Sequence, residues 1–162
     1  MDKDEKLVAA VKPEQLSVIP EIAEAVYFIK DDKTVAKQEW VILDEFNNLV
    51  NTRPFDQLIT DYGDKYKVYA AREDGRLVQS WLEVNGIWYY FKEDYTARYQ
   101  YWQAHWNDWY LFENYTYVTN RWHPTSEGRW YYLDSEGRMV RNQWIDDCWI
   151  NEDGIYWSPL YN

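Results

Sequence analysis

Tryptophan recurs along this chain at an almost constant interval. The steps between Trp81, Trp102, Trp122 and Trp144 are 21, 20 and 22 residues, and Trp40 precedes Trp81 by 41 residues, which is two such steps. A unit of about 20 residues is too small to bury a core alone, so this period is typical of supersecondary units that stack on their neighbours. The spacing therefore predicts a repeat array.

Each repeat contains a short aromatic segment. Three such segments align: residues 88–91 (WYYF), 109–112 (WYLF) and 130–133 (WYYL). In the clearest copy, residues 130–144 (WYYLDSEGRMVRNQW), we predict a strand, a turn that ends at Gly137, and a second strand that ends at Trp144. Aromatic side chains favour strands, and Gly137 supplies the positive φ that a tight turn needs. We interpret this copy as a β-hairpin.

The same turn position is filled differently in the other copies. It holds Lys33, Asn47 and Gly75 in the earlier copies, and Tyr95 and Tyr115 in the two central ones. Glycine adopts a left-handed turn conformation without strain and asparagine is the next best residue. We therefore expect the two tyrosines to strain their turns or to change their shape.

The pattern divides the chain into three predicted parts. Residues 1–26 contain short helical segments separated by prolines, and we interpret them as an N-terminal helical cap. Residues 27–65 are degenerate hairpin repeats, interrupted at 56–66 by a short helix or a long loop. Residues 66–162 are aromatic-rich repeats that end in an atypical cap. The predicted fold class is all-β, a β-hairpin repeat fold with a short helical cap.

Composition excludes several classes of protein. Aromatic residues make up 20% of the chain, which excludes a disordered chain, and no run of about 20 apolar residues could cross a membrane. The net charge of -11 repels polyphosphate, so a nucleic-acid partner is not expected. A cationic ligand, or a neutral one such as a sugar, fits this charge balance better.

The reactive side chains do not form a catalytic or metal-binding pattern. His105 and His123 lie 18 residues apart with no third ligand at a suitable spacing, so we predict no metal site. Cys148 is the single cysteine, and we interpret it as an inert thiol. The acidic pairs at 44–45 and 146–147 are interpreted as surface charge. We predict no catalytic residue and no cofactor.

Two segments carry a recognisable pattern. Residues 80–91 (SWLEVNGIWYYF) and 121–133 (RWHPTSEGRWYYL) resemble the choline-binding, or cell-wall-binding, repeats of Gram-positive surface proteins and phage lysins, and the related glucan-binding repeats. The resemblance is strong over residues 66–144, extends back to Tyr27, and does not reach residues 1–26. It implies a left-handed solenoid of stacked hairpins with ligand sites between neighbouring hairpins.

The resemblance implies aromatic cages as the ligand sites. We call the tryptophans at the constant interval the closing tryptophans, because each ends a repeat. Each cage combines a closing tryptophan, the tryptophan of the aromatic segment that follows it and a ring from the next hairpin. Side chains two positions apart in a strand share a face, so Tyr132 lies on the face of Trp130, and Tyr131 points away. Trp102, Trp109 and Tyr132 are therefore the best predicted cage.

A second predicted cage starts with Trp81 and Trp88. Leu111 stands where its third ring should be, so the cage is complete only if Tyr110 turns toward it. The resemblance implies a cation–π site in such cages, because a quaternary ammonium has no hydrogen to donate and binds to electron-rich ring faces.

A third predicted cage contains Trp122 and Trp130. Its third ring comes from the C-terminal segment, with Trp149 and Tyr156 as the two candidates, and no site is expected before Trp81. The candidate ligand-binding residues are thus Trp102, Trp109, Tyr132, Trp81, Trp88, Tyr110, Trp122 and Trp130.

The chain departs from the family pattern before each closing tryptophan. Where the family has glycine, this chain has Ser80, Tyr101, Arg121 and Gln143. These side chains are expected to crowd or change the grooves, which leaves room for a different ligand such as a neutral glycan.

Two functions from different classes fit these patterns. The first is a non-catalytic cell-wall-binding module that recognises the choline of teichoic acids, or a glucan, without inserting into a membrane. The alternative is a protein-interaction scaffold of degenerate repeats, acting as the accessory or targeting part of a larger assembly. An enzyme is not expected, because the repeats occupy residues 27–162. The predicted location is extracellular or at the cell surface, or the cytoplasm before lysis if a phage encodes the chain.

Overall fold

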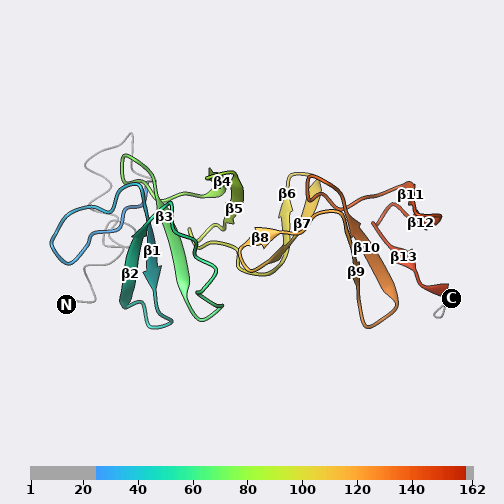
Figure 1. The fold of residues 1–162 in the computed structure, drawn as a ribbon, viewed down its shortest axis with the longest axis horizontal. Coiled ribbons are helices and arrows are strands. Elements are labelled where there is room, and N and C mark those ends of the chain that lie inside the picture. The colour runs from blue at the N-terminus through green and yellow to red at the C-terminus, as the bar shows by residue number, and fades with distance from the viewer. Residues whose placement is uncertain (1–24, 160–162) are drawn as a thin grey trace. The chain divides into compact units, whose positions relative to one another are not determined.

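The computed structural model describes residues 25–159, and this part of the chain is built from strands joined by turns and loops (Figure 1). The thirteen strands are β1 (Glu39–Leu43), β2 (Leu49–Pro54), β3 (Lys67–Ala71), β4 (Ser80–Val84), β5 (Ile87–Phe91), β6 (Tyr101–His105), β7 (Asp108–Glu113), β8 (Thr116–Tyr117), β9 (Arg121–Pro124), β10 (Arg129–Leu133), β11 (Gln143–Ile145), β12 (Cys148–Ile150) and β13 (Tyr156–Trp157). The predicted all-β class is confirmed.

The predicted helical cap over residues 1–26 falls almost entirely outside the described residues. Within residues 25–159 there is no helix long and apolar enough to span a membrane. The chain forms two compact units, residues 1–99 and 100–162. Each unit has its own hairpins and its own buried side chains.

The first unit is centred on the sheet β2–β1–β3, in which both neighbours of β1 run antiparallel to it. Four of the five residues of β1 are buried, as are four of the five residues of β3. Such a strand has neighbours on both edges, and its side chains are covered on both faces. The sequence of a strand in this position is therefore a continuous apolar run. This explains why the sequence of β1, EWVIL, lacks the polar alternation of a half-exposed strand.

The segment that interrupts the repeats is a loop and not a helix. It runs from the end of β2 to β3 and buries Ile59 completely. The guanidinium of Arg53 holds the loop, because it donates to the Asp61 carboxylate at 3.0 Å and to the Tyr62 hydroxyl at 2.9 Å. Its central carbon also lies 4.6 Å from the centre of the Tyr62 ring, a cation–π distance.

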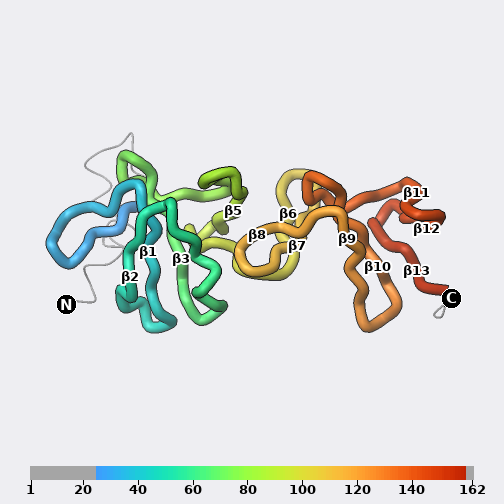
Figure 2. The backbone as a smooth tube through the Cα atoms, in the orientation of Figure 1, coloured from blue at the N-terminus to red at the C-terminus, as the bar shows by residue number. Residues whose placement is uncertain are grey.

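A hairpin recurs in both units, and in each copy the closing tryptophan begins the hairpin. The strand pairs are β4–β5 in the first unit and β6–β7, β9–β10 and β11–β12 in the second (Figures 1 and 2). The closing tryptophan lies opposite a residue of the strand that follows it: Trp81 opposite Tyr90, Trp102 opposite Leu111, Trp122 opposite Tyr132, and Trp144 opposite Trp149.

The predicted hairpin over residues 130–144 is correct near its turn and wrong at its end. Across the turn at Gly137, an antiparallel bridge joins Leu133 to Met139, and the Val140 amide donates to the carbonyl of Tyr132 at 2.9 Å. Trp144 does not continue this pairing, because it lies in β11 and pairs with β12. The Met139 amide also donates to the carbonyl of Trp109, in the preceding hairpin, at 2.8 Å. That bond connects successive repeats.

The predicted turn residues adopt the left-handed conformation. Lys33, Asn47 and Tyr95 have φ values of 74°, 66° and 72°, close to the 83° of Gly137. In each turn the amide of this residue donates to the carbonyl three positions earlier, at 2.9 to 3.0 Å. The turn therefore keeps its hydrogen bond when a side chain replaces glycine, and the cost is backbone strain at the substituted residue.

The turn at Tyr115 has a different shape from the turn at Gly137, which is one of the two outcomes expected for a tyrosine at this position. Asn114 and Tyr115 both have positive φ, 51° and 76°, and they connect β7 directly to β8. Two consecutive left-handed residues are typical of a two-residue hairpin turn. The ring of Tyr115 is buried, so packing stabilises a conformation that tyrosine rarely adopts.

The backbone before each closing tryptophan has a left-handed residue at one of two positions. Ser80 and Tyr101 keep the left-handed conformation expected of glycine, with φ of 67° and 75°. In the two later repeats the left-handed residue lies one position earlier, at Asn120 and Asn142. Tyr101 is 67% exposed, so its side chain extends into solvent.

Lys33→Asn is expected to stabilise the first unit by about 0.5 to 1 kcal/mol, because asparagine tolerates positive φ better than lysine does. Thermal unfolding of the full chain measures the change. Lys37→Asn is the matched control, since it removes the same charge from an exposed residue outside the left-handed set. Equal effects of the two substitutions would show that the backbone at Lys33 is not strained.

Candidate functional site

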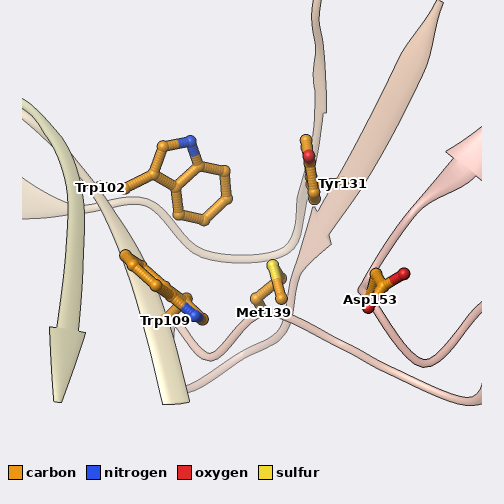
Figure 3. Close-up of a pocket in the computed structure, with 5 residues that line it drawn as sticks. All are labelled: Trp102, Trp109, Tyr131, Met139 and Asp153. Atoms are coloured by element: carbon orange, nitrogen blue, oxygen red, sulfur yellow. The ribbon is translucent and has the colours of Figure 1, made fainter. Parts of the chain in front are cut away.

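A small aromatic pocket lies in the second unit. Its volume is about 250 Å³, and Figure 3 shows the residues that line it: Trp102, Trp109, Tyr131, Met139 and Asp153. The two tryptophans come from β6 and β7, the tyrosine from β10, the methionine from the segment after β10, and the aspartate from the turn between β12 and β13. Residues from three successive repeats therefore meet at one place.

The register of β6 and β7 puts both tryptophans on one face. Trp109 lies opposite Ala104, and Ala104 is two positions from Trp102, so the three side chains share a face. The small Ala104 leaves space between the two indoles. Trp109 is 43% exposed and therefore presents part of its ring to a ligand. The predicted pairing of Trp102 with Trp109 agrees with this geometry.

The third ring of the pocket is Tyr131 and not Tyr132. The Tyr131 ring centre lies 5.3 Å from that of Trp102 in an edge-to-face arrangement. Tyr132 points to the opposite face of β10, where its ring centre is 5.1 Å from that of Trp122. The expected alternation holds, since Trp130 and Tyr132 do share a face. That face, however, belongs to the following groove, so the predicted position of Tyr132 is wrong.

His123 supports the tyrosine side of the pocket. It lies directly opposite Tyr131 in the β9–β10 pair, and its ring centre is 6.0 Å from that of Trp102. Burial lowers the pKa of His123, and the nearby Arg121 guanidinium lowers it further. At pH 7 the neutral imidazole therefore predominates, so His123 adds little positive charge beside the pocket.

Met139 and Asp153 were not among the predicted ligand-binding residues. Both lie in segments that the pattern treats as turns or connections, and no local signal marks them as ligand-binding residues. The signal that could identify Met139 is its place two residues after the turn glycine, where the chain crosses to the preceding hairpin. Asp153 occupies the next turn of the same type, just before Gly154.

The second group of rings also lies in the second unit. Trp122 contacts Trp130 at 6.4 Å, Tyr132 at 5.1 Å and Tyr156 at 5.9 Å between ring centres. Of the two candidates for the third ring, Tyr156 therefore lies at this group. Trp149 instead packs against Trp144, the tryptophan opposite it in the β11–β12 pair, at 5.4 Å.

The first unit contains the same tryptophan pair. The ring centres of Trp81 and Trp88 are 6.3 Å apart, nearly the separation of Trp122 and Trp130, and Trp88 is 42% exposed. The third side of this predicted cage would come from the second unit, so its closure stays a prediction. Within the second unit, Leu111 is buried.

The Tyr110 ring lies beside a ring of its own unit. Its centre is 5.8 Å from that of Tyr117, with an angle of 31° between the two ring planes. Burial raises the pKa of Tyr110, which keeps its hydroxyl protonated at neutral pH. A role for Tyr110 in the cage of Trp81 and Trp88 stays a prediction.

The closing tryptophan at position 40 is part of the core. Its side chain is completely buried, its Nε1 donates to the carbonyl of Gln57 at 3.1 Å, and its ring contacts Phe55 and Tyr89 at 5.0 Å and Phe91 at 6.3 Å. The rings that surround Trp40 belong to the chain itself. This tryptophan therefore offers no free ring face to a ligand.

Two family models match the chain. Residues 80–94 match a cell wall binding repeat, and residues 116–156 match a choline-binding repeat. No curated protein matches the chain in sequence. The second match includes Tyr131, Met139 and Asp153.

Several solved structures from Streptococcus pneumoniae are similar. The choline binding domain of Spr1274 is 28% identical, with 49% of this chain and 94% of that one covered and a TM-score of 0.43. The choline-binding domain of CbpL is 24% identical, with 84% and 72% covered and a TM-score of 0.49. CbpJ is 19% identical, with 82% of this chain and 38% of CbpJ covered and a TM-score of 0.53.

The likeness to CbpJ concerns the fold alone. The family assignment follows from the two matched models, which cover the β4–β5 hairpin and most of the second unit. They agree with the recurring tryptophan pairs and with the left-handed turns described above. The chain thus contains repeats of the choline-binding, or cell-wall-binding, family.

Proposed function

We propose that this chain is a non-catalytic cell-wall-binding module, and that its pocket of Trp102, Trp109, Tyr131 and Met139 binds the trimethylammonium group of choline. The observation that supports this proposal is the convergence of three aromatic rings and one thioether on a single small pocket. The indoles of Trp102 and Trp109 and the thioether of Met139 do not titrate near neutral pH, and all four side chains offer apolar surface to a ligand. They are suited to binding.

The chemistry of the pocket matches that of a quaternary ammonium. The cation is attracted to the ring faces by about 0.5 to 2 kcal/mol per ring, and its methyl groups pack against Met139. After the cost of immobilising the ligand, three rings give an affinity in the millimolar range, about -4 kcal/mol. A single site of this kind is weak, so the biological target is a polymer with many choline groups.

Choline-bearing teichoic acid at the cell surface is therefore the proposed partner. A glucan is the other ligand class linked to this type of repeat. The pocket of about 250 Å³ is below the usual range of about 300 to 1,000 Å³ for sites that enclose larger ligands. This size favours a headgroup over an enclosed sugar chain.

Trp109→Ala is expected to weaken choline binding by about 2- to 30-fold, because it removes one ring face worth about 0.5 to 2 kcal/mol. Titration with choline, followed by tryptophan fluorescence and by thermal shift, measures the effect. Trp106→Ala is the matched control: this tryptophan belongs to the same hairpin but is 89% exposed and does not line the pocket. The control is expected to bind choline like the unmodified chain.

Two other results would change the proposal. A response to glucan oligosaccharides, with none to choline, would replace the ligand but keep the module. Indifference to both would support the alternative of a protein-interaction scaffold, for which the exposed side chains of Trp106 and Trp144 are the available contacts.

A further inference from the structure

An acidic residue, Asp153, is among the residues that line the aromatic pocket. Asp153 is the one acidic side chain among the five residues that line the pocket, and Figure 3 shows it on the far side of Met139 from the two tryptophans. An acidic residue also precedes the left-handed residue in other turns, as Asp74 and Glu136 do, so the acid itself belongs to the turn pattern. The position of Asp153 has a structural cause that can be traced through the turn that holds it.

The turn between β12 and β13 fixes the backbone of Asp153. The side-chain oxygen of Asn151 accepts hydrogen bonds from the amides of Asp153 and Ile155, both at 2.9 Å. The amide of Gly154 donates to the carbonyl of Asn151 at 3.1 Å. These bonds use the backbone of Asp153 and leave its carboxylate out of the turn.

Close packing brings this turn against the pocket. Gly154 has φ of 81°, and a Cβ atom at this position would lie 2.5 Å from Cε of Met139. Any larger residue here would displace the end of the Met139 side chain. Since Met139 is itself a wall of the pocket, the residue before Gly154 is held at the edge of the same cavity.

We propose that Asp153 is a specificity-determining residue, which makes this pocket select a cationic headgroup over a neutral group of the same shape. The proposal rests on the proposed function of the pocket. In this proposal, the preference of the pocket for a cation over a neutral ligand depends on Asp153 as well as on the three rings.

Electrostatics supports this role. A quaternary ammonium cannot donate a hydrogen bond, so a carboxylate acts on it through charge alone, and the attraction depends on distance and solvent screening. Asp153 is exposed, so water reduces its contribution to that of an ordinary surface charge. An effect of about threefold on affinity is expected at low salt. A neutral ligand of equal size gains nothing from the same charge.

The acidic residue that begins β7 is paired with an arginine. Oδ1 of Asp108 lies 3.7 Å from the Arg141 guanidinium, which compensates the charge of Asp108. Arg141 also donates to the carbonyl of Asn107. This pair ties the hairpin turn to the segment after Met139 and adds little net charge to the pocket.

The test compares choline with 3,3-dimethyl-1-butanol, its neutral isostere. Asp153→Asn keeps the size of the side chain and removes its charge. Choline affinity is expected to fall about threefold, whereas affinity for the isostere stays within about 1.5-fold, because screened surface charge acts on the cation only. Glu152→Gln is the matched control, since it removes the same charge from an exposed residue of the same turn that does not line the pocket.

The outcomes separate the two proposals. If Asp153→Asn and Glu152→Gln change the ratio of choline to isostere affinity equally, the assignment to Asp153 is overturned, while choline binding by the rings stands. If the unmodified chain binds neither ligand, the proposed function fails, and the assignment fails with it. Retained binding of the isostere by Asp153→Asn shows that the pocket is still folded.

Discussion

Replacing Trp40 with alanine is expected to destabilise the first unit by about 3 to 5 kcal/mol, the usual cost of removing a large buried aromatic side chain. The indole is completely buried and packs against Phe55, Tyr89 and Phe91. Its removal leaves a cavity among rings from the loop after β2 and from β5. It also removes the hydrogen bond from the indole N–H to the carbonyl of Gln57.

Urea unfolding of the full chain, followed by circular dichroism, measures this loss. Trp106→Ala is the control, because that tryptophan is 89% exposed and its loss is expected to change the free energy of unfolding by less than about 0.5 kcal/mol. A cost below about 1 kcal/mol for Trp40→Ala would contradict the structure, since it would mean that the site collapses without a cavity.

Gly154→Ala is expected to lower the free energy of unfolding by about 1 to 3 kcal/mol and to weaken choline binding severalfold. Two effects add. An alanine at φ of 81° is strained, and its methyl group would overlap the end of the Met139 side chain. Because that side chain is flexible, we expect it to move, and the wall that it forms in the pocket moves with it.

Gly86→Ala separates the two effects. Gly86 has nearly the same φ, 83°, but a Cβ atom there would meet nothing within 4 Å. It therefore reports the backbone strain alone. Thermal unfolding and choline titration of both variants give the comparison. Equal losses of choline affinity would show that Gly154 does not control the position of Met139.

Local features of the sequence predicted much of the fold. The tryptophan interval identified the repeat, and the aromatic segments identified the strands β5, β7 and β10. The turn position was also correct at Lys33, Asn47 and Tyr95, although none of these residues is glycine. These features depend on neighbours within a few residues, so the local sequence contains the necessary information.

The pairing of segments across repeats could not be predicted in the same way. Alternation correctly put Tyr131 and Tyr132 on opposite faces of β10, but it does not say which face meets the preceding hairpin. Which face meets the preceding hairpin depends on how the repeats stack. The hydrogen bond from the Met139 amide to the Trp109 carbonyl is one of the contacts that determine this stacking. The end of the predicted hairpin over residues 130–144 failed for the same reason. Trp144 pairs with Trp149 of β12, and no local pattern identifies that partner.

The pocket draws its walls from three successive repeats: Trp102 and Trp109 from one, Tyr131 and Met139 from the next, and Asp153 from the third. An array of this kind therefore has two fewer complete sites than repeats, because a site has all of its walls only where two more repeats follow. Loss of the last repeat would remove the carboxylate from the site two repeats upstream and weaken that site for cations, while leaving its hairpin folded. Truncation should thus lower polymer avidity before it removes structure.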